Sequence, residues 1–308
     1  MTGEENAAAA PLRERAEQLR GEALRLLEKG EFHASLVLYD EALSSARGSG
    51  DPAFVDWIYS CRAAAAAEAG PADEELVELK RILLRSSDPQ TSFRAAYSEA
   101  RIYELKRDVR KALFYSRIAG EKAAALGDPF LLACAESARG ALLVADSRFD
   151  DAAEAFEHSL RVSDPPANVL PLWRAMWKDN LGYCRMALDQ VDAGLALVHE
   201  AFATMEEAGA KAHTIPPLLD LCFGYLKIDR YAEARYFGEE ALERLPLAAD
   251  PTAEKNCLYL LGETCHLAGD KPAAQGYFDR LAALYPEFKN LRAYLDVFDF
   301  RNVINLRS

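Results

Sequence analysis

Few side chains in this sequence have the spacing that catalysis or metal binding requires. The five histidines fall in separate parts of the chain: His33, His158, His199, His213 and His266. None of them stands in the HExxH spacing of a zinc-dependent hydrolase, and no stretch follows the GxxxxGK(S/T) pattern that cradles phosphate groups. Cys265 and His266 are neighbours, but consecutive side chains on a helix point about 100° apart. We therefore predict no catalytic residues, no metal site, no cofactor and no enzymatic activity.

Composition and charge narrow the classes of partner. The chain has 308 residues, of which 50% are hydrophobic and 28% charged, as expected for a folded protein rather than a disordered one. Its 36 Lys and Arg against 49 Asp and Glu give a net charge of −13, which repels a nucleic-acid backbone. The start, MTGEENAAAAP, does not resemble a signal peptide, and no apolar stretch is long enough to cross a bilayer. We predict a cytoplasmic protein that binds neither nucleic acid nor membrane.

The six cysteines show neither a ligand pattern nor a redox pattern. No two of them form a CxxC pair, the spacing typical of zinc knuckles and thioredoxin-like sites. They are scattered through segments of helical periodicity, at Cys61, Cys134, Cys184, Cys222, Cys257 and Cys265. Buried, reduced thiols are the favoured interpretation, with a disulfide as the alternative, because cytosolic chains seldom keep one.

The elements that must position any functional side chain are helices arranged in pairs. Segments of helical periodicity are separated by marks that contain Asp-Pro, at 48–52, 86–90, 126–129, 163–166 and 248–251. Asp can cap a helix and Pro is tolerated in its first turn, so each mark predicts a helix start. A second set of short turns lies at 29–32, 69–72, 105–108, 146–149, 188–191, 228–231 and 268–271. Each of these turns divides a unit into two helices.

Small residues recur where the two helices of each pair are expected to cross. One of them precedes each short turn at a fixed distance: Ala23, Ala63, Ala100, Gly140, Gly182, Cys222 and Gly262. Successive members of this series are separated by nearly the same length of chain. On the facing helix the corresponding residue is small in six pairs, and the exception is Glu75. The sequence therefore predicts seven helical hairpins that repeat with a period of about 40 residues.

This pattern resembles the tetratricopeptide repeat family. The last unit carries most of the family's signature, with Leu258, Leu261, Gly262, Ala274, Phe278 and Pro286. The usual period is about 34 residues. Because its units are longer than this, the chain is more similar to kinesin light chains and to bacterial peptide-sensing regulators. The resemblance implies an all-α fold: a right-handed solenoid of seven hairpins followed by a C-terminal capping helix.

The predicted organisation covers the whole chain. Residues 1–12 are expected to form a flexible lead-in, and residues 287–308 a capping helix with a tail. The seven repeats between them are predicted at about 13–50, 51–88, 89–127, 128–164, 165–208, 209–249 and 250–286.

In proteins of this family the first helix of each repeat lines a concave groove. Transferring that rule implies a set of partner-binding residues rich in Arg and aromatic side chains, which dominate binding energy at interfaces. The predicted set is Arg94, Tyr97, Arg101, Asp179, Asn180, Tyr183, Phe223, Asn256, Tyr259 and Glu263. The alternative for each residue is that it only packs between neighbouring first helices.

The end of the chain has a second candidate surface. Apolar residues continue beyond the helical spacing of the predicted cap, at Phe298, Phe300, Val303, Ile304 and Leu306. One interpretation is that they cover the exposed apolar end of the repeat stack. The other is that they leave the cap and dock on a partner or on a second copy of the chain.

These features favour a non-catalytic adaptor or scaffold that binds a peptide or protein segment in the groove. One alternative is a regulatory sensor, whose groove binds a small peptide or metabolite and signals to an effector. Another is a structural subunit held in a larger complex through its ends. A homo-oligomer is possible, but nothing in the sequence indicates one.

Overall fold

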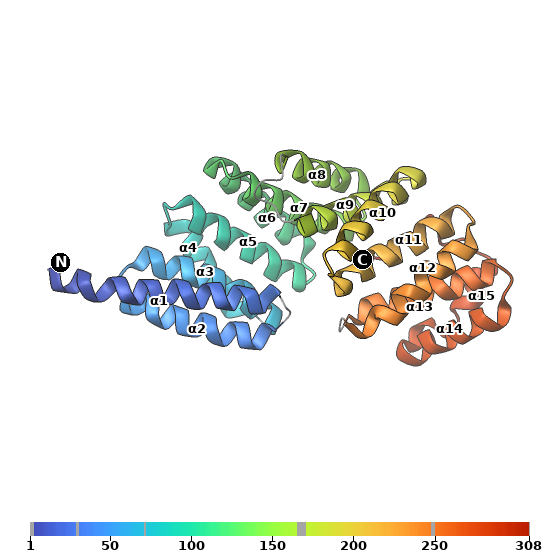
Figure 1. Ribbon diagram of the computed structural model, residues 1–308, viewed down its shortest axis with the longest axis horizontal. Coiled ribbons are helices and arrows are strands. Elements are labelled where there is room, and N and C mark those ends of the chain that lie inside the picture. Colours follow the sequence, from blue (N-terminus) through green and yellow to red (C-terminus); the bar gives the residue numbers. More distant parts are fainter. Residues whose placement is uncertain (1–2, 29–30, 71, 165–170, 248–249, 308) are drawn as a thin grey trace. The chain divides into compact units, whose positions relative to one another are not determined.

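The computed structural model describes residues 3–28, 31–70, 72–164, 171–247 and 250–307. Throughout these ranges the regular structure is helical, without any strand (Figure 1). The chain divides into two compact units, Met1–Leu142 and Leu143–Ser308, called unit 1 and unit 2 below.

Unit 1 is built from paired helices, α1 with α2, α3 with α4 and α5 with α6. Their bounds are Gly3–Glu28 for α1, Phe32–Gly48 for α2, Pro52–Ala69 for α3, Asp73–Arg85 for α4, Pro89–Leu105 for α5 and Val109–Leu126 for α6. Helix α7, Pro129–Ala145, runs across the boundary into unit 2.

In unit 2, α9 pairs with α10, α11 with α12 and α13 with α14, while α11 also packs beside both α9 and α13. The bounds are Phe149–Val162 for α8, Pro171–Ala187 for α9, Val191–Glu207 for α10, Ile215–Lys227 for α11, Tyr231–Arg244 for α12, Pro251–Leu267 for α13, Lys271–Leu284 for α14 and Leu291–Leu295 for α15. Short 3-10 turns lie at Lys211–Thr214, Leu245–Leu247 and Pro286–Phe288.

The Asp-Pro marks begin helices as predicted. Asp51 accepts hydrogen bonds from the N–H groups of residues 53 and 54, at 3.0 and 3.2 Å, and Pro52 is the first residue of α3. Asp88, Asp128 and Asp250 make equivalent bonds at the starts of α5, α7 and α13. Two of the marks are described only in part. Residues 165–166 of the mark at 163–166 and residues 248–249 of the mark at 248–251 lie outside the described residues.

The short turns between paired helices share one backbone feature. A residue with a left-handed conformation occurs at the same place in five of them, at Arg107, Ser147, Asp189, Asp229 and Gly269, with φ between 57° and 82°. Residues with positive φ end helices because their N–H groups, and those that follow, can bond to the last carbonyls. Here Asp108 donates its N–H to the carbonyl of Tyr103, at 2.9 Å. The repeat seen in the sequence is thus a repeat of turn geometry.

Small residues at the crossings let the helix backbones come into contact. A Cβ atom placed on Gly194 of α10 would lie 2.6 Å from the carbonyl oxygen of Gly182 on α9. At Gly182 the same atom would lie 2.8 Å from the carbonyl oxygen of Gly194. No alanine can occupy either position without moving one of the helices. This contact fixes how α9 and α10 pack, and α9 carries part of the site described below.

The second hairpin, α3 with α4, is built differently. Glu75 stands where the other hairpins have Ser, Ala or Gly, and its carboxylate accepts a hydrogen bond from Arg62 at 2.9 Å. Ile82, at another position where most hairpins have a small residue, is fully buried in a cluster with Leu79 and Ile102. A long side chain at the crossing needs room, so these helices are joined by side chains rather than by touching backbones.

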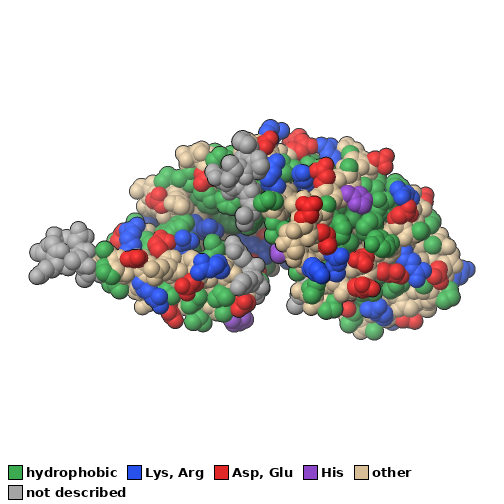
Figure 2. All heavy atoms as spheres, viewed as in Figure 1, with side chains coloured by type: hydrophobic (Ala, Val, Ile, Leu, Met, Phe, Trp, Pro, Cys, Tyr) green, Lys and Arg blue, Asp and Glu red, His purple; other side chains and the backbone are tan. Residues whose placement is uncertain are grey.

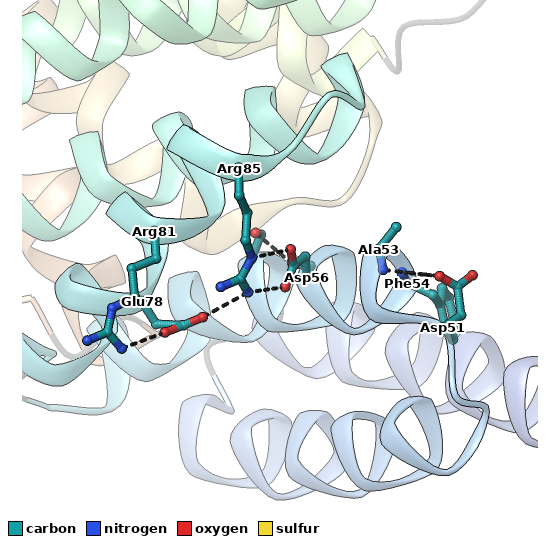
Figure 3. Close-up of polar contacts among 8 residues, drawn as sticks. Asp51, Ala53, Phe54, Asp56, Glu78, Arg81 and Arg85 are labelled. Atoms are coloured by element: carbon teal, nitrogen blue, oxygen red, sulfur yellow. Dashed lines mark hydrogen bonds and ion pairs between the residues drawn. The ribbon is translucent and has the colours of Figure 1, made fainter.

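Asp56 on α3 and Arg85 on α4 form the main polar contact of this hairpin (Figure 3). Arg85 donates from Nε and Nη2 to the two carboxylate oxygens of Asp56, at 2.9 and 2.5 Å. Glu78 accepts from Arg85 at 2.9 Å and from Arg81 at 3.2 Å. Asp56 is buried, with 8% of its surface exposed, so the compensation of its charge depends on Arg85.

The two ends of the chain differ from a simple lead-in and cap. Residues 3–12, predicted to be flexible, are part of α1, because the alanines at 7–10 have a high helix propensity that carries the helix through Pro11. At the other end, α15 has only five residues, Leu291–Leu295. The chain then turns back toward α11 and α13 rather than continuing as a helix.

The surface carries charge of both signs. On the face shown in Figure 2, acidic and basic side chains are interspersed among apolar ones rather than gathered into a patch of one sign.

Five of the six cysteines are buried, and all six are free thiols; Cys134 is partly buried. None of the helices in the described part of the chain is long and apolar enough to span a membrane.

Replacing Gly194 by alanine tests the backbone contact at the α9–α10 crossing. We expect a loss of about 1–3 kcal/mol in the free energy of unfolding, because the new Cβ atom would overlap a carbonyl oxygen. The matched control is Gly276→Ala on α14, where the added Cβ would meet nothing within 4 Å. There, the higher helix propensity of alanine should raise stability by up to about 1 kcal/mol. Urea denaturation measures both, and equal effects would contradict the predicted contact.

Replacing Arg85 by alanine tests the polar contact in the second hairpin. The change leaves the buried carboxylate of Asp56 without its partner, so we expect a loss of about 1–3 kcal/mol in unfolding free energy. Arg81→Ala is the control, because the Arg81 side chain is 66% exposed and its ion pair is with Glu78 on the same helix. It should change stability by less than about 0.5 kcal/mol. Thermal and urea unfolding distinguish the two variants.

Candidate functional site

Residues 299–307, called the tail below, lie on the first helices of unit 2. The tail forms one turn, in which Val303 and Ile304 donate their N–H groups to the carbonyl of Phe300, at 3.0 and 2.9 Å. Residues 305–307 then contact side chains of α9, α11 and α13. We call these facing side chains the wall: Asp179, Asn180, Tyr183, Asp220, Phe223, Asn256, Tyr259 and Glu263.

Tyr183 of α9 is the centre of these contacts. Its hydroxyl donates to Oδ1 of Asn305 at 3.1 Å and accepts from the backbone N–H of Leu306 at 2.9 Å. The ring is fully buried, with its centroid 5.8 Å from that of Phe223 on α11. Burial raises the pKa of the Tyr183 phenol, so it remains a neutral hydrogen-bond donor. One wall side chain therefore holds two successive residues of the tail.

Asn305 and Leu306 are held through both amide and backbone groups. Nδ2 of Asn305 donates to the carbonyl of Val144 at 2.7 Å and to the hydroxyl of Ser147 at 3.0 Å. The carbonyl of Leu306 accepts from Nδ2 of Asn256 on α13 at 2.6 Å. With the bond from its N–H to Tyr183, both backbone polar groups of Leu306 are satisfied by the wall. Its side chain is buried, with 6% of the residue exposed.

Arg307 lies in an acidic pocket between α9 and α11. Its Nη2 donates to Asp220 and to Oδ2 of Asp179, the latter at 3.4 Å, and its Nη1 donates to Asn180. The guanidinium carbon lies 4.7 Å from the centroid of the Tyr183 ring. Both aspartates are 3% exposed, so the guanidinium is the cation that compensates their charge.

Burial and charge act against each other in this pocket. Burial raises the pKa of Asp179, while Arg307 acts to lower it, and the net shift is upward. The pKa of Asp220 is raised further, because Asp179 repels its charge as well. Burial acts to lower the pKa of Arg307, but the two carboxylates outweigh it. Removing the cation would therefore favour proton uptake by the pair.

The start of the tail makes a second ionic contact. Arg301 donates to the carbonyl of Leu226, in the last turn of α11, at 3.3 Å and to Asp229, just beyond that helix, at 2.6 Å. Glu263 of α13 is 1% exposed, and burial raises the pKa of its carboxyl to about 7, with a further contribution from Asp299. Around neutral pH this carboxyl therefore changes its charge beside the tail.

The tail leaves space on both sides of Leu306. A cavity of about 180 Å³ is lined by α11 and α13 together with Leu306 and Arg307. Another, of about 220 Å³, is lined by Tyr259, Phe288, Phe300 and Ile304 among others. Both are large enough to hold more atoms than the tail places there.

Most of the residues predicted on the second unit come together in the structure. Asp179, Asn180, Tyr183 and Asn256 bond to the tail, and Tyr259 lines the cavity beside it. Phe223 is buried against Tyr183, and Glu263 is buried next to the tail's charged residues.

Of the predicted docking residues, three face the wall and two do not. Phe300 and Ile304 line the 220 Å³ cavity, and Leu306 is buried. Phe298 and Val303 are 54% and 63% exposed, respectively.

Sequence reasoning missed Asp220 of the wall and the polar residues by which the tail is held. Asp220 lies one repeat period after Asn180, just as Cys222 lies one period after Gly182, so the repeat register could have identified it. Arg301, Asn305 and Arg307 carry no such signal, since the tail lies outside the repeats.

The predicted residues Arg94, Tyr97 and Arg101 belong to unit 1, on α5. Arg101 is paired with Glu68 at 2.6 Å and with Glu104 at 2.7 Å, which cancels its charge. The guanidinium of Arg94 lies 6.0 Å from the Tyr97 ring, and its Nε has no hydrogen-bond partner in the described part of the chain. Burial raises the pKa of Tyr97 to about 12. Of the two arginines predicted here, Arg94 is the one without an ion pair among the described residues.

His199 is packed among aromatic side chains rather than placed in a reactive group. Its Nε2 lies 2.8 Å from the Tyr225 hydroxyl, and its ring also packs against Phe237. Burial lowers the pKa of His199. Within the described ranges, His, Cys, Asp and Glu side chains do not gather in groups of three that could hold a metal ion.

No protein-family model and no curated protein matches this chain. Several solved structures do. The apo form of RapI has 10% sequence identity and a TM-score of 0.68, covering 91% of this chain and 82% of RapI. A Rap protein complexed with competence and sporulation factor has 11% identity and a TM-score of 0.70, over 90% and 78% of the two chains. The apo form of the quorum sensor NprR from B. thuringiensis has 13% identity and a TM-score of 0.67, over 92% and 80%.

At these identities the similarity concerns the fold. The chain is an all-helical repeat array of the tetratricopeptide-like kind, and the sequence-based prediction of this fold class is confirmed. The likeness in fold to the Rap protein and to NprR agrees with the resemblance stated from the sequence.

Replacing Glu263 by glutamine tests the buried carboxyl beside the tail. Its folded-state pKa of about 7 exceeds the ordinary value of 4.5, so between these pH values the folded state holds a proton that the unfolded state has released. Wild-type stability should therefore fall as pH rises through this window and level off above it. The glutamine variant, neutral at every pH, should be more stable than wild type by on the order of 1–3 kcal/mol above pH 7.

Urea unfolding at several pH values between 5 and 8 measures this difference. Glu287→Gln is the control, because Glu287 is exposed. Burial also raises the pKa of Glu99 in unit 1 to about 7. This residue is unchanged in wild type and in both variants, so its contribution to the pH dependence cancels in the comparison. A stability advantage of Glu263→Gln that does not grow with pH would contradict the raised pKa.

Proposed function

We propose that this protein binds a segment of another polypeptide on the wall of unit 2, without catalysing a reaction on it. The observation that carries the proposal is the tail, which lies on the wall through backbone, amide and guanidinium hydrogen bonds. A surface that holds one segment of chain in this way has the groups needed to hold another of similar chemistry.

The contacts divide into general and selective ones. Tyr183 and Asn256 bond to the backbone N–H and carbonyl of Leu306, groups that nearly every residue offers. Backbone contacts of this kind provide affinity for any chain that adopts the same local conformation. Side-chain pockets on either side then provide selectivity.

Within this proposal, a sensor is supported by a specific observation. The tail covers the wall, so an external segment binds only when the tail leaves, and the protein then has a tail-bound and a tail-released state. Two such states are what a regulatory protein needs. The solved structures of similar fold include a Rap protein complexed with competence and sporulation factor and the quorum sensor NprR, which is in keeping with this role. An adaptor would use the same wall without passing on the change.

Releasing the tail in the intact chain tests the proposal. The double variant Asn305→Ala/Arg307→Ala removes the amide and guanidinium anchors while keeping the chain length. We expect it to enrich specific sequences from a displayed library of random peptides, whereas wild type enriches them at least about tenfold less because its wall is occupied. Thermal unfolding checks that the variant remains folded.

A further substitution shows whether enriched peptides bind the wall. Tyr183→Phe, added to the double variant, removes the hydroxyl that bonds to Leu306 and should weaken their binding about tenfold. Tyr236→Phe is the matched control, since Tyr236 is 60% exposed on α12. Failure to enrich any peptide, or binding unchanged by Tyr183→Phe, would refute the proposal.

A further inference from the structure

We propose that the pocket of Asp179, Asn180, Asp220 and Tyr183 is a guanidinium-specific subsite, and that the segment the wall takes from a partner protein carries arginine in the order Asn–apolar–Arg. This inference rests on the proposed function and states which ligand chemistry the site selects.

The charge balance of the pocket calls for a cation. Asp179 and Asp220 are each 3% exposed, and a pair of buried carboxylates is costly unless a positive group bonds to both. Arg307 supplies that group in the tail-bound state. A side-chain hydrogen bond also joins the carboxyls of Asp179 and Asp220, so the two hold the guanidinium as a pair. An incoming segment that covers the two carboxyls again needs a cation in the same place.

The geometry favours arginine over lysine. The guanidinium bonds through two nitrogens to three side chains on two helices, and its carbon lies 4.7 Å from the centroid of the Tyr183 ring. Such a divided set of acceptors matches the planar, forked donors of arginine. A lysine ammonium is a single point donor and cannot reach Asn180 and Asp220 from two separate atoms.

Asn305, two positions before Arg307, is held by the same wall residue, Tyr183. Oδ1 of Asn305 accepts from the Tyr183 hydroxyl at 3.1 Å and from the backbone N–H of Arg307 at 3.0 Å. Its Nδ2 donates to the Val144 carbonyl at 2.7 Å. Tyr183 thus contacts Asn305 through its hydroxyl and Arg307 through its ring. A segment with asparagine and arginine two positions apart satisfies all of these groups at once.

The residue between them has room for variation. The cavities of about 180 and 220 Å³ both border Leu306, so a larger apolar side chain would find space there. A partner segment can therefore fit the wall more closely than the tail does. The net charge of −13 also attracts a basic segment of another protein and repels a second copy of this chain.

Synthetic peptides test the arginine preference directly. The probe is the sequence of residues 299–307, acetylated and amidated, and the receptor is the intact Asn305→Ala/Arg307→Ala chain. Fluorescence anisotropy measures the dissociation constants. Citrulline at the position of Arg307 keeps the shape but removes the charge, and should weaken binding about a hundredfold because a neutral group cannot compensate the aspartates that the peptide buries. Lysine there should weaken binding about tenfold, through the lost forked hydrogen bonds.

A matched change in the pocket identifies where the charge is recognised. Asp220→Asn in the receptor should reduce the preference for arginine over citrulline at least about tenfold. Asp192→Asn, at an exposed position on α10, should leave that preference unchanged. Should the double variant not fold, Arg307→Gln alone, which keeps the Asn305 anchors, replaces it as receptor.

Each outcome bears on a different statement. A citrulline peptide that binds as tightly as the arginine peptide would overturn the guanidinium subsite and leave the peptide-binding proposal standing. Peptides that do not bind the receptor at all, whatever their sequence, would count against the peptide-binding proposal itself. A wild-type dimer in sedimentation experiments that dissociates on Arg307→Gln would show a second copy as the occupant, and would overturn the assignment to a partner protein.

Discussion

The contact of helix backbones at small residues is the constraint on which the rest of this structure depends. Where Gly182 and Gly194 meet, a Cβ atom on either residue would lie within 2.8 Å of the other's carbonyl oxygen, so the crossing accepts no larger side chain. Small residues recur at the crossings once per repeat, so positions one period apart are carried to neighbouring first helices. Asn180 and Asp220 illustrate the result, since both bond to the same guanidinium. The binding wall is a by-product of helix packing.

How far the sequence predicts this protein depends on the range of the interactions involved. Asp-Pro caps act between near neighbours in the chain and hairpin crossings within one repeat, so both were recognisable in the sequence. Four predicted wall residues do bond to the tail, because the repeat register decides which side of a helix they share. The partners of Arg307 lie 87 and 128 residues away, and no periodicity connects a tail to a repeat. The helical start at 3–12 was missed because the alanine run was read as a flexible lead-in.

The chemistry of the wall is in keeping with the proposed role in recognition. Its ionisable groups are two aspartates that face a guanidinium, two tyrosines held neutral by burial, and a glutamate whose pKa of about 7 follows from its burial. Backbone contacts at Leu306 are indifferent to sequence, while the acidic pocket beside them is not. Such a division allows the apolar position of a bound segment to vary while the cation keeps its place. It also explains why the wall, on a strongly acidic protein, holds the tail's basic residues.

Because the tail belongs to the same molecule as the wall, every copy of this protein carries a tethered competitor. A segment joined by a short linker experiences an effective concentration on the order of millimolar, which a free partner rarely reaches in solution. To occupy half of the molecules, a partner must therefore bind more tightly than the tail does. The required factor is the effective concentration of the tail divided by the concentration of free partner. Substitutions in residues 299–307 would shift that threshold without altering the wall. In the proposed function, the tail thus sets a sensitivity to the partner that can evolve separately from the selectivity of the wall.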